Sequence, residues 1–208
     1  MRRSGVRFLS PAPSLYVVVI DVYKEVMEIN AQGLIKGIPY TASPNCDDRP
    51  PAAEIEVLIV HAISLPPGEF GGPDVERLFS NTLDCDSHPF YSGLKGRQVS
   101  AHLFIRRDGS MMQFVPFAKR AWHAGESEIE GRNRVNDFSI GIELEGADDD
   151  PFEEAQYQVL AAVSRLLVAQ YELMDFSRIY GHSQIAPNRK TDPGPHFDWP
   201  HYLSMCRA

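Results

Sequence analysis

The sequence has little cysteine and no long apolar segment. Its three cysteines, Cys46, Cys85 and Cys206, are far apart and form no CxxC pair. Neither a disulfide framework nor a thiolate zinc site is therefore indicated, and a reducing cytoplasm is the expected setting. The apolar run at residues 15–20 is far shorter than the roughly 20 residues of a membrane-spanning helix, so no membrane association is expected.

Positive charge is also scarce. The chain has 20 lysines and arginines against 28 aspartates and glutamates, a formal net charge of −8. Because proteins that bind nucleic acid need clustered cations against the phosphates, a nucleic-acid partner is not expected. No internal repeat is present, and 208 residues suffice for one domain with a substantial core, expected to be a monomer.

The first 26 residues do not have the features of an export signal. Arg2-Arg3 precede a short apolar patch, but no Ala-x-Ala cleavage site follows it. Residues 5–8 read Gly-Val-Arg-Phe, which the T-arm consensus of a transfer RNA gene would encode, and Ala12-Pro13 is what a terminal GCACCA would encode. We therefore predict a start codon assigned too far upstream, a disordered tail over residues 1–26 and the folded domain over residues 27–208.

Hydrophobic periodicity predicts strands interleaved with helices. Residues 57–60 are a continuous apolar run, typical of a central strand covered on both faces. Residues 138–146 alternate with period two, which puts Ile140, Ile142 and Leu144 on one face and Gly141, Glu143 and Glu145 on the other. Gly141 leaves room beside Glu143 for another group to approach closely.

The remaining elements complete an α/β (α+β) domain. Residues 101–107 and 111–116 predict a hairpin around Asp108-Gly109, and residues 179–181 a short strand. Helices are expected at residues 73–79, after an N-cap at Asp150 with Pro151 and Glu153 in the first turn, and from Asp198 onward. Residues 27–53, 81–98 and 123–137 are expected to be mostly loops. The prediction is a single domain with a central mixed β-sheet flanked by helices.

Two histidines and one aspartate suggest a metal site. His61 ends the apolar run, at the sheet rim where sites of α/β folds collect, and His182 follows the short strand at 179–181. Asp192 lies in a turn before Pro193-Gly194. Two neutral imidazoles and a carboxylate are ligands that zinc accepts at a catalytic site, with a fourth position for water. Alone, His61 is equally a core histidine and Asp192 an ordinary turn residue. A structural zinc would need a fourth protein ligand, and none is obvious.

The chain resembles the AmpD-type N-acetylmuramoyl-L-alanine amidases in six segments that occur in family order. The resemblance covers roughly residues 35–205 and is carried by residues 60–73, 99–102, 105–109, 120–125, 136–146 and 189–195. It implies a peptidoglycan-amidase and recognition-protein-like fold and one Zn²⁺ per chain, bound by His61, His182 and Asp192. It also implies that Glu143 is the catalytic acid/base and that Lys190 stabilises the transition state. Ala62 departs from the family, which often has an asparagine there to bind substrate.

The implied reaction is hydrolysis of the amide bond between N-acetylmuramic acid and L-alanine in 1,6-anhydro-muropeptides, during peptidoglycan turnover. Zinc would activate water and polarise the carbonyl. Glu143 would take the proton of the water and pass it to the departing nitrogen. Lys190 would face the developing oxyanion, where a preorganised donor contributes roughly 3 kcal/mol.

Four further residues are candidate substrate contacts. Arg134 could hold a stem-peptide carboxylate, and Trp122 could give the sugar a flat apolar face. His123 and Asn136 lie in matched segments; His123 is equally consistent with a contact behind the metal or with core packing. Simple solvation of Arg134 and core burial of Trp122 are the competing interpretations.

Two other functions share these features. One is a secreted amidase that acts on intact peptidoglycan, which lacks the support of a convincing export signal. The other is a non-catalytic peptidoglycan-binding module of the same fold. Such modules tend to lose a zinc ligand, whereas this chain keeps all three together with Glu143 and Lys190.

Overall fold

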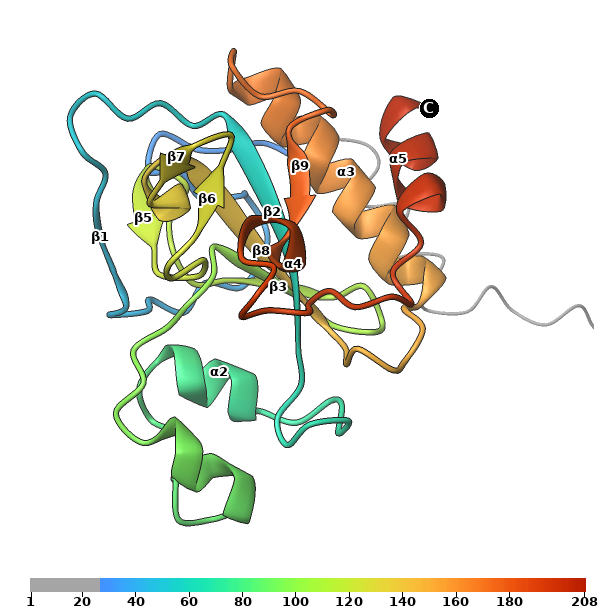
Figure 1. The fold of residues 1–208 in the computed structure, drawn as a ribbon. Coiled ribbons are helices and arrows are strands. Elements are labelled where there is room, and N and C mark those ends of the chain that lie inside the picture. The colour runs from blue at the N-terminus through green and yellow to red at the C-terminus, as the bar shows by residue number, and fades with distance from the viewer. Residues whose placement is uncertain (1–26) are drawn as a thin grey trace, which may run out of the picture.

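A five-stranded mixed sheet organises the residues that the computed structural model describes, 27–208. The strands run in the order β4 (Met111–Gln113), β3 (Leu103–Ile105), β8 (Ser139–Glu145), β2 (Val57–Ile63) and β9 (Ile179–Gly181). β3 and β4 pair antiparallel as the expected hairpin, and the other neighbours pair parallel. The predicted class, with its central mixed sheet, is confirmed (Figure 1). The expectations for residues 1–26 lie outside the described residues.

Strand β2 lies between two parallel neighbours and is covered on both faces, as its continuous apolar run predicts. Leu58 and Val60 belong to the main core, on the side of the long helix. Val57 and Ile59 belong to a smaller cluster on the opposite face. All four side chains are completely buried. His61 continues this alternation, so it lies on the face of Val57 and Ile59.

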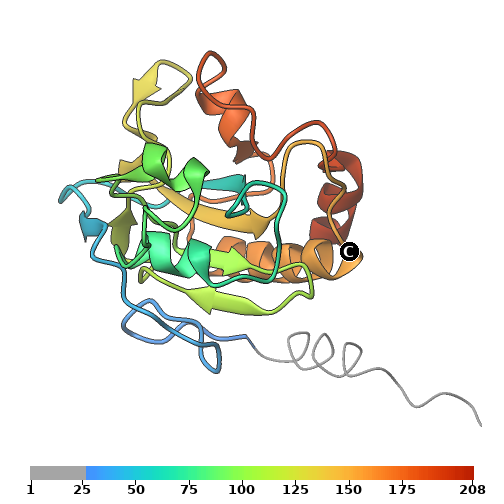
Figure 2. The ribbon, with the colours of Figure 1, turned by 90° about the horizontal axis from the view of Figure 1, so that it is seen from below.

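Two helices cover one face of the sheet. α3 (Glu154–Gln170) and α5 (Trp199–Arg207) lie side by side there (Figure 1). Ile140, Ile142 and Leu144 of β8 pack in the same cluster as the buried stripe of α3, as the two periodicities predict. Burial of one such aliphatic side chain contributes about 1.5–3 kcal/mol. In Figure 2, α3 in orange and α4 (His182–Ile185) in red-orange lie on opposite sides of the sheet.

The start of α3 differs from the prediction. The N-cap is Glu153 and not Asp150, and the side chain of Gln156 accepts a hydrogen bond of 3.1 Å from the backbone N–H of Glu153. Tertiary packing decides this, because Phe152 is buried in the core ahead of the helix. Gln156 also donates to the carbonyl of Glu145 at 3.0 Å, which ties the first turn to the end of β8.

A lobe below the sheet contains α2 (Asp74–Phe79) and the 3-10 helix η1 (Pro89–Leu94) (Figure 1). It packs through Leu78 and Phe79 against Phe104 of β3 and against Phe114, the residue that follows β4. α2 is the helix expected at residues 73–79. η1 falls in a segment expected to be loop, with Pro89 in its first turn and a side-chain cap from His88.

Two short strand pairs and a 3-10 helix lie in or beside the other segments that were expected to be loops. β1 (Cys46–Asp48) pairs with β5 (Lys119–Ala121), and β6 (Glu128–Ile129) pairs with β7 (Arg132–Asn133). The 3-10 helix η2 (Val135–Asp137) leads into β8. The expectation that residues 27–53 and 123–137 are mostly loop missed these pairs, which are too short to show a period. Within residues 27–208, no helix combines the length and the apolar character that crossing a membrane requires.

Candidate active site

The carboxyl ends of three parallel strands meet at one edge of the sheet. In the register of β2 and β8, His61 lies directly across from Glu143. On the other side of β2, Val60 pairs with Gly181, the last residue of β9, and His182 comes next. Parallel pairing therefore brings two histidines and a carboxylate from distant parts of the chain to one point, where sites of α/β folds collect.

His61, His182 and Asp192 form a group that could hold a metal ion. Nδ1 of His61 is 2.9 Å from Nδ1 of His182 and 3.1 Å from Oδ2 of Asp192. Nδ1 of His182 is also 3.1 Å from that oxygen. Three vertices of a tetrahedron around zinc, with bonds of about 2.0–2.1 Å, are roughly 3.3 Å apart. The residues present thus fit one face of a tetrahedral site and leave the fourth vertex to the cleft.

Close contacts fix both the ring of His182 and its two neighbours in the chain, Gly181 and Ser183. Nε2 of His182 lies 3.0 Å from the carbonyl oxygen of Ala124, which can only accept, so that nitrogen carries the proton and Nδ1 keeps its lone pair. Ser183 donates its backbone N–H to the carbonyl of Asp192 at 2.9 Å. A Cβ on Gly181 would lie 2.8 Å from Cδ of Pro193, so glycine permits the strand end to approach the Asp192 turn.

Charge at the site matches the protonation that zinc ligands need. Burial lowers the pKa of His61 to about 4, so its imidazole is neutral near pH 7. A neutral imidazole beside an ionised carboxylate is the state in which both can coordinate a cation.

Glu143 and Lys190 line one cleft together with His182 and Asp192. Oε2 of Glu143 is buried and has no hydrogen-bond partner among the described residues. Burial, and then the negative charge of Asp192, raises the pKa of Glu143 well above its ordinary value. Buried polar atoms in native proteins are nearly always partnered, so this oxygen is suited to a group that enters from outside the chain.

Glu145, two residues along the same strand face, has a different environment. Its carboxylate is 4% exposed and accepts hydrogen bonds from the backbone N–H of Gly71 at 2.6 Å and of Arg107 at 3.2 Å. Arg106 donates to it at 3.3 Å. These partners use the acceptor capacity of Glu145 to attach the 65–72 loop to the sheet. Of the two carboxylates, Glu143 is the one available for chemistry.

The structure brings one of the four predicted substrate contacts, His123, to this cleft. Oδ1 of Asn136 instead accepts from the backbone N–H of Ala124 at 2.8 Å, which supports the loop beneath His182. Nε1 of Trp122 donates to Asp47 at 3.2 Å, and Arg134 forms an ion pair of 3.1 Å with Asp137. These three are not among the residues that line the cleft, and their roles as substrate contacts stay predictions.

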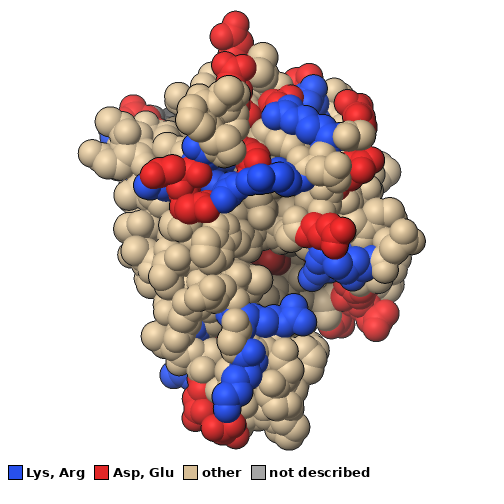
Figure 3. Space-filling view, turned by 60° about the vertical axis from the view of Figure 1, so that its left-hand side comes forward, with Lys and Arg blue, Asp and Glu red and all other residues tan. Residues whose placement is uncertain are grey.

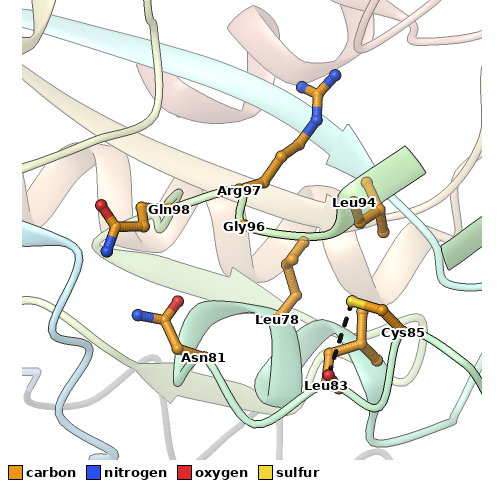
Figure 4. Close-up of a pocket in the computed structure, with 8 residues that line it drawn as sticks. All are labelled: Leu78, Asn81, Leu83, Cys85, Leu94, Gly96, Arg97 and Gln98. Atoms are coloured by element: carbon orange, nitrogen blue, oxygen red, sulfur yellow. Dashed lines mark hydrogen bonds between the residues drawn. The ribbon is translucent and has the colours of Figure 1, made fainter. Parts of the chain in front are cut away.

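Arg97 is a cleft residue that the sequence reasoning missed. It lines the cleft and also a second hollow, together with Leu78 and Leu94, which are common to both. Figure 4 shows its guanidinium extending away from Leu83 and Cys85 at the far end of that hollow. Within residues 27–208 Arg97 has no ion-pair partner, and its Nε makes one long hydrogen bond of 3.4 Å to the carbonyl of Gly93. Its place beside the matched segment at 99–102 is the only sequence signal for it.

One face of the molecule is hollowed between the lobe and the body (Figure 3). A carboxylate is visible inside the hollow, and lysine and arginine side chains stand around its rim (Figure 3). Acidic side chains lie beside these cations, so the rim carries both signs of charge (Figure 3).

Comparisons with known proteins agree with this geometry. Residues 51–195 match a family described as N-acetylmuramoyl-L-alanine amidase. The 1,6-anhydro-N-acetylmuramyl-L-alanine amidase AmpD of Salmonella typhimurium strain SL1344 is 56% identical over 163 residues, which are 78% of this chain and 87% of that protein. A crystal structure of a Se-Met AmpD derivative is 50% identical with a TM-score of 0.83, covering 86% of this chain and 99% of that one.

A more distant solved structure contains a substrate. The N-acetylmuramyl-L-alanine amidase AmiD from E. coli, in complex with anhydro-N-acetylmuramic acid-L-Ala-D-gamma-Glu-L-Lys, is 31% identical with a TM-score of 0.53. The match covers 76% of this chain and 60% of that one.

Proposed function

This chain belongs to the N-acetylmuramoyl-L-alanine amidase family, and we propose that it hydrolyses the amide bond between 1,6-anhydro-N-acetylmuramic acid and L-alanine in muropeptides. The observation that carries the proposal is the convergence of His61, His182 and Asp192 at the strand edge, with the unpartnered carboxylate of Glu143 in the same cleft. The high identity to AmpD favours the anhydro-muropeptide as substrate.

The proposed cofactor is one zinc ion, held by Nδ1 of His61, Nδ1 of His182 and a carboxylate oxygen of Asp192. When bound, zinc supplies Lewis acidity and lowers the pKa of water. The three ligands are all that the described residues offer within reach, and three protein ligands with one open position are the usual arrangement of a catalytic zinc site.

Glu143 is the proposed acid/base. Its carboxylate takes a proton from the attacking water and delivers it to the amide nitrogen as the bond to L-alanine breaks. A raised pKa suits this exchange, because a group that titrates nearer to neutrality can both accept and return a proton. Lys190 lines the same cleft and donates to the oxyanion that develops on the muramoyl carbonyl.

Arg97 is the proposed contact for the stem peptide. A D-Glu joined through its γ-carboxyl keeps a free α-carboxylate, and the peptide bound to AmiD contains such a residue. Arg97 is the lobe-side cation of the cleft without an acidic partner among the described residues. A guanidinium binds a carboxylate through two parallel hydrogen bonds, so Arg97 is suited to hold the peptide while Glu143 and Lys190 act on the bond.

The setting we propose is the cytoplasm, in peptidoglycan recycling. The few, widely separated cysteines, Cys46, Cys85 and Cys206, favour a reducing compartment. Fractionation of cells that express the full chain tests this directly. A secreted enzyme would be found outside the cytoplasmic fraction, and the alternative of an amidase on intact wall would then gain support. We also propose that the protein is a monomer, and light scattering measures its oligomeric state.

One experiment tests the activity and its substrate. Purified protein is incubated with anhydro-muropeptide and with intact sacculi, each with and without a chelator, and the products are identified by mass. We expect free peptide and anhydro-N-acetylmuramic acid from the fragment, and no products after chelation. Binding of the fragment without cleavage would favour the peptidoglycan-binding module, and cleavage of sacculi alone would favour the wall amidase.

A further inference from the structure

The side of His61 that faces away from Asp192 contacts another histidine. Nε2 of His61 lies 2.9 Å from Nδ1 of His123, and the two rings are nearly perpendicular, at 82°. His123 is 9% exposed and sits behind the metal ligand. The reaction described above gives it no task.

The hydroxyl of Ser139, on the other side of the His123 ring, determines the direction of these hydrogen bonds. Oγ of Ser139 lies 2.6 Å from the carbonyl of Val135, to which it donates its single proton. It can therefore only accept from Nε2 of His123, at 3.2 Å, so that nitrogen carries a proton. The ring of His123 is buried and its hydrogen-bond partners, Ser139 and His61, include no carboxylate, so the imidazole is neutral and carries only that one proton.

Nδ1 of His123 is consequently an acceptor, and the proton between the two histidines belongs to Nε2 of His61. A neutral imidazole carries one proton. Nδ1 of His61, which faces His182 and Asp192, thus keeps its lone pair, the form that a metal ligand needs.

Strand β8 is shaped to receive the ring of His123. A Cβ on Gly141 would lie 2.4 Å from Cγ of His123, a distance that real contacts do not show. The sequence predicts that Gly141 leaves room for another group to approach the strand closely. In the structure that group is the imidazole of His123. The ring is held between the backbone of β8 and His61, with Ser139 of the same strand at its far nitrogen.

We propose that His123 and Ser139 are positioning residues, and that the Ser139 hydroxyl, acting through His123, fixes His61 in the tautomer that binds metal through Nδ1. The inference rests on the proposed metal site but not on the amidase reaction. His182 is held in the same tautomer by a main-chain carbonyl, which no side-chain substitution removes. The tautomer of His61, in contrast, depends on two side chains, those of His123 and Ser139. Mutation of partners of this kind typically lowers metal affinity by about 10–100-fold.

The first test reads the tautomer in the unmodified protein. Zinc-free protein with ¹⁵N-labelled histidine is examined by long-range ¹H–¹⁵N correlation, which distinguishes a proton on Nδ1 from one on Nε2. We expect His61 and His123 both to carry the proton on Nε2. A proton on Nδ1 of His61 in the unmodified protein would overturn the proposal, whatever any variant does.

The second test compares two buried serines. Ser139→Ala removes the hydroxyl that accepts from His123, and Ser164→Ala makes the same change within α3, where the hydroxyl donates to the carbonyl of Leu160 at 2.7 Å. Zinc affinity is measured by competition with a chelator. We expect a loss of about 10–100-fold and a mixed His61 tautomer for Ser139→Ala, and neither change for Ser164→Ala. Wild-type zinc affinity in Ser139→Ala would contradict the proposal.

A third pair covers the case in which Ser139→Ala does not fold. His123→Asn keeps an acceptor for Nε2 of His61, and His123→Leu removes it, so the asparagine variant should retain zinc more tightly. Equal affinities would contradict the proposal. Because these measurements need no muropeptide, a protein that binds zinc as expected but cleaves nothing would refute the proposed function and leave this inference intact.

Discussion

The two walls of the cleft are built differently. On the sheet wall, His61 and His182 each have a second partner that fixes the orientation of the ring. On the lobe wall, Arg97 is exposed and makes one long hydrogen bond. Chemistry needs groups held to within a fraction of an ångström, whereas recognition of a flexible peptide tolerates an adaptable side chain. The contrast suggests that reaction and specificity reside on separate parts of the fold.

The largest expected effect comes from removing a ligand on the sheet wall. His182→Ala should leave a folded protein that loses zinc on dialysis and hydrolyses muropeptide several orders of magnitude more slowly. Metal content by mass spectrometry and the melting temperature check this. His196→Ala, at an exposed histidine, is the matched control and should change neither. Full activity in metal-free His182→Ala would refute the metal assignment.

The next effect separates the two carboxylates of β8. Glu143→Gln keeps the shape of the side chain and removes the proton acceptor, so the rate should fall by about 10²–10⁴ with zinc content unchanged. Glu145→Gln should change the rate far less but lower stability by about 1–3 kcal/mol, because three donors lose a charged partner. Single-turnover rates and thermal melts measure the two effects, and the reverse pattern would mean that Glu145 is the catalytic carboxylate.

A smaller effect is expected where β8 meets the ring of His123. Gly141→Ala puts a methyl group 2.4 Å from Cγ of His123, so the ring must shift. We expect a stability loss of about 1–3 kcal/mol together with weaker zinc binding. Chelator competition and chemical denaturation measure both. A stability loss with unchanged zinc affinity would show that the ring can move without disturbing His61.

The effect on the lobe wall should be smaller still and of another kind. Arg97→Gln should raise KM for anhydro-muropeptide about fivefold, the worth of roughly 1 kcal/mol, and leave kcat unchanged. Lys95→Gln, an exposed cation two residues away that is not among the cleft residues, is the control. A change in kcat for Arg97→Gln would place this wall in the chemistry and remove the distinction between the two walls.

No effect on either wall is expected from removing residues 1–26. A chain that begins at Met27 should fold, bind zinc and hydrolyse substrate like the full chain, because no matched segment lies in the first 26 residues and ordering them would cost roughly 1–2 kcal/mol per residue. Melting temperature, zinc content and rate provide the check. A melting temperature lower by many degrees would show that the segment belongs to the folded domain.

Much of the sheet wall could be predicted from the sequence. The apolar run before His61 and the alternation around Glu143 are determined by local periodicity, and both strands form as expected. The grouping of His61, His182 and Asp192 followed from ligand chemistry and the family resemblance, and the structure places their donor atoms together. The two strands are predictable because each depends on burial of a short, regular segment.

The remaining features depend on contacts between distant segments. The N-cap of α3 is Glu153 and not the predicted Asp150, because Phe152 packs in the core and the side chain of Gln156 donates a hydrogen bond to the end of β8. The β6–β7 pair has two residues in each strand, too few for any period to show. Arg97 faces the cleft because α2 and η1 pack against Phe104. Periodicity carries no information on such packing, so the lobe wall was the less predictable of the two.

The parallel pairing of β2 with both β8 and β9 also has a consequence for synthesis. β2 leaves the ribosome early, but both strands that cover its edges are made much later in the chain. Until Gly181 has emerged, one of the most apolar segments of the protein has an open edge, which is the condition that favours chaperone binding and aggregation. His61, the first ligand of the proposed zinc site, is therefore made long before the other two ligands. Zinc bound by all three proposed ligands would report completed folding and would not assist its early steps.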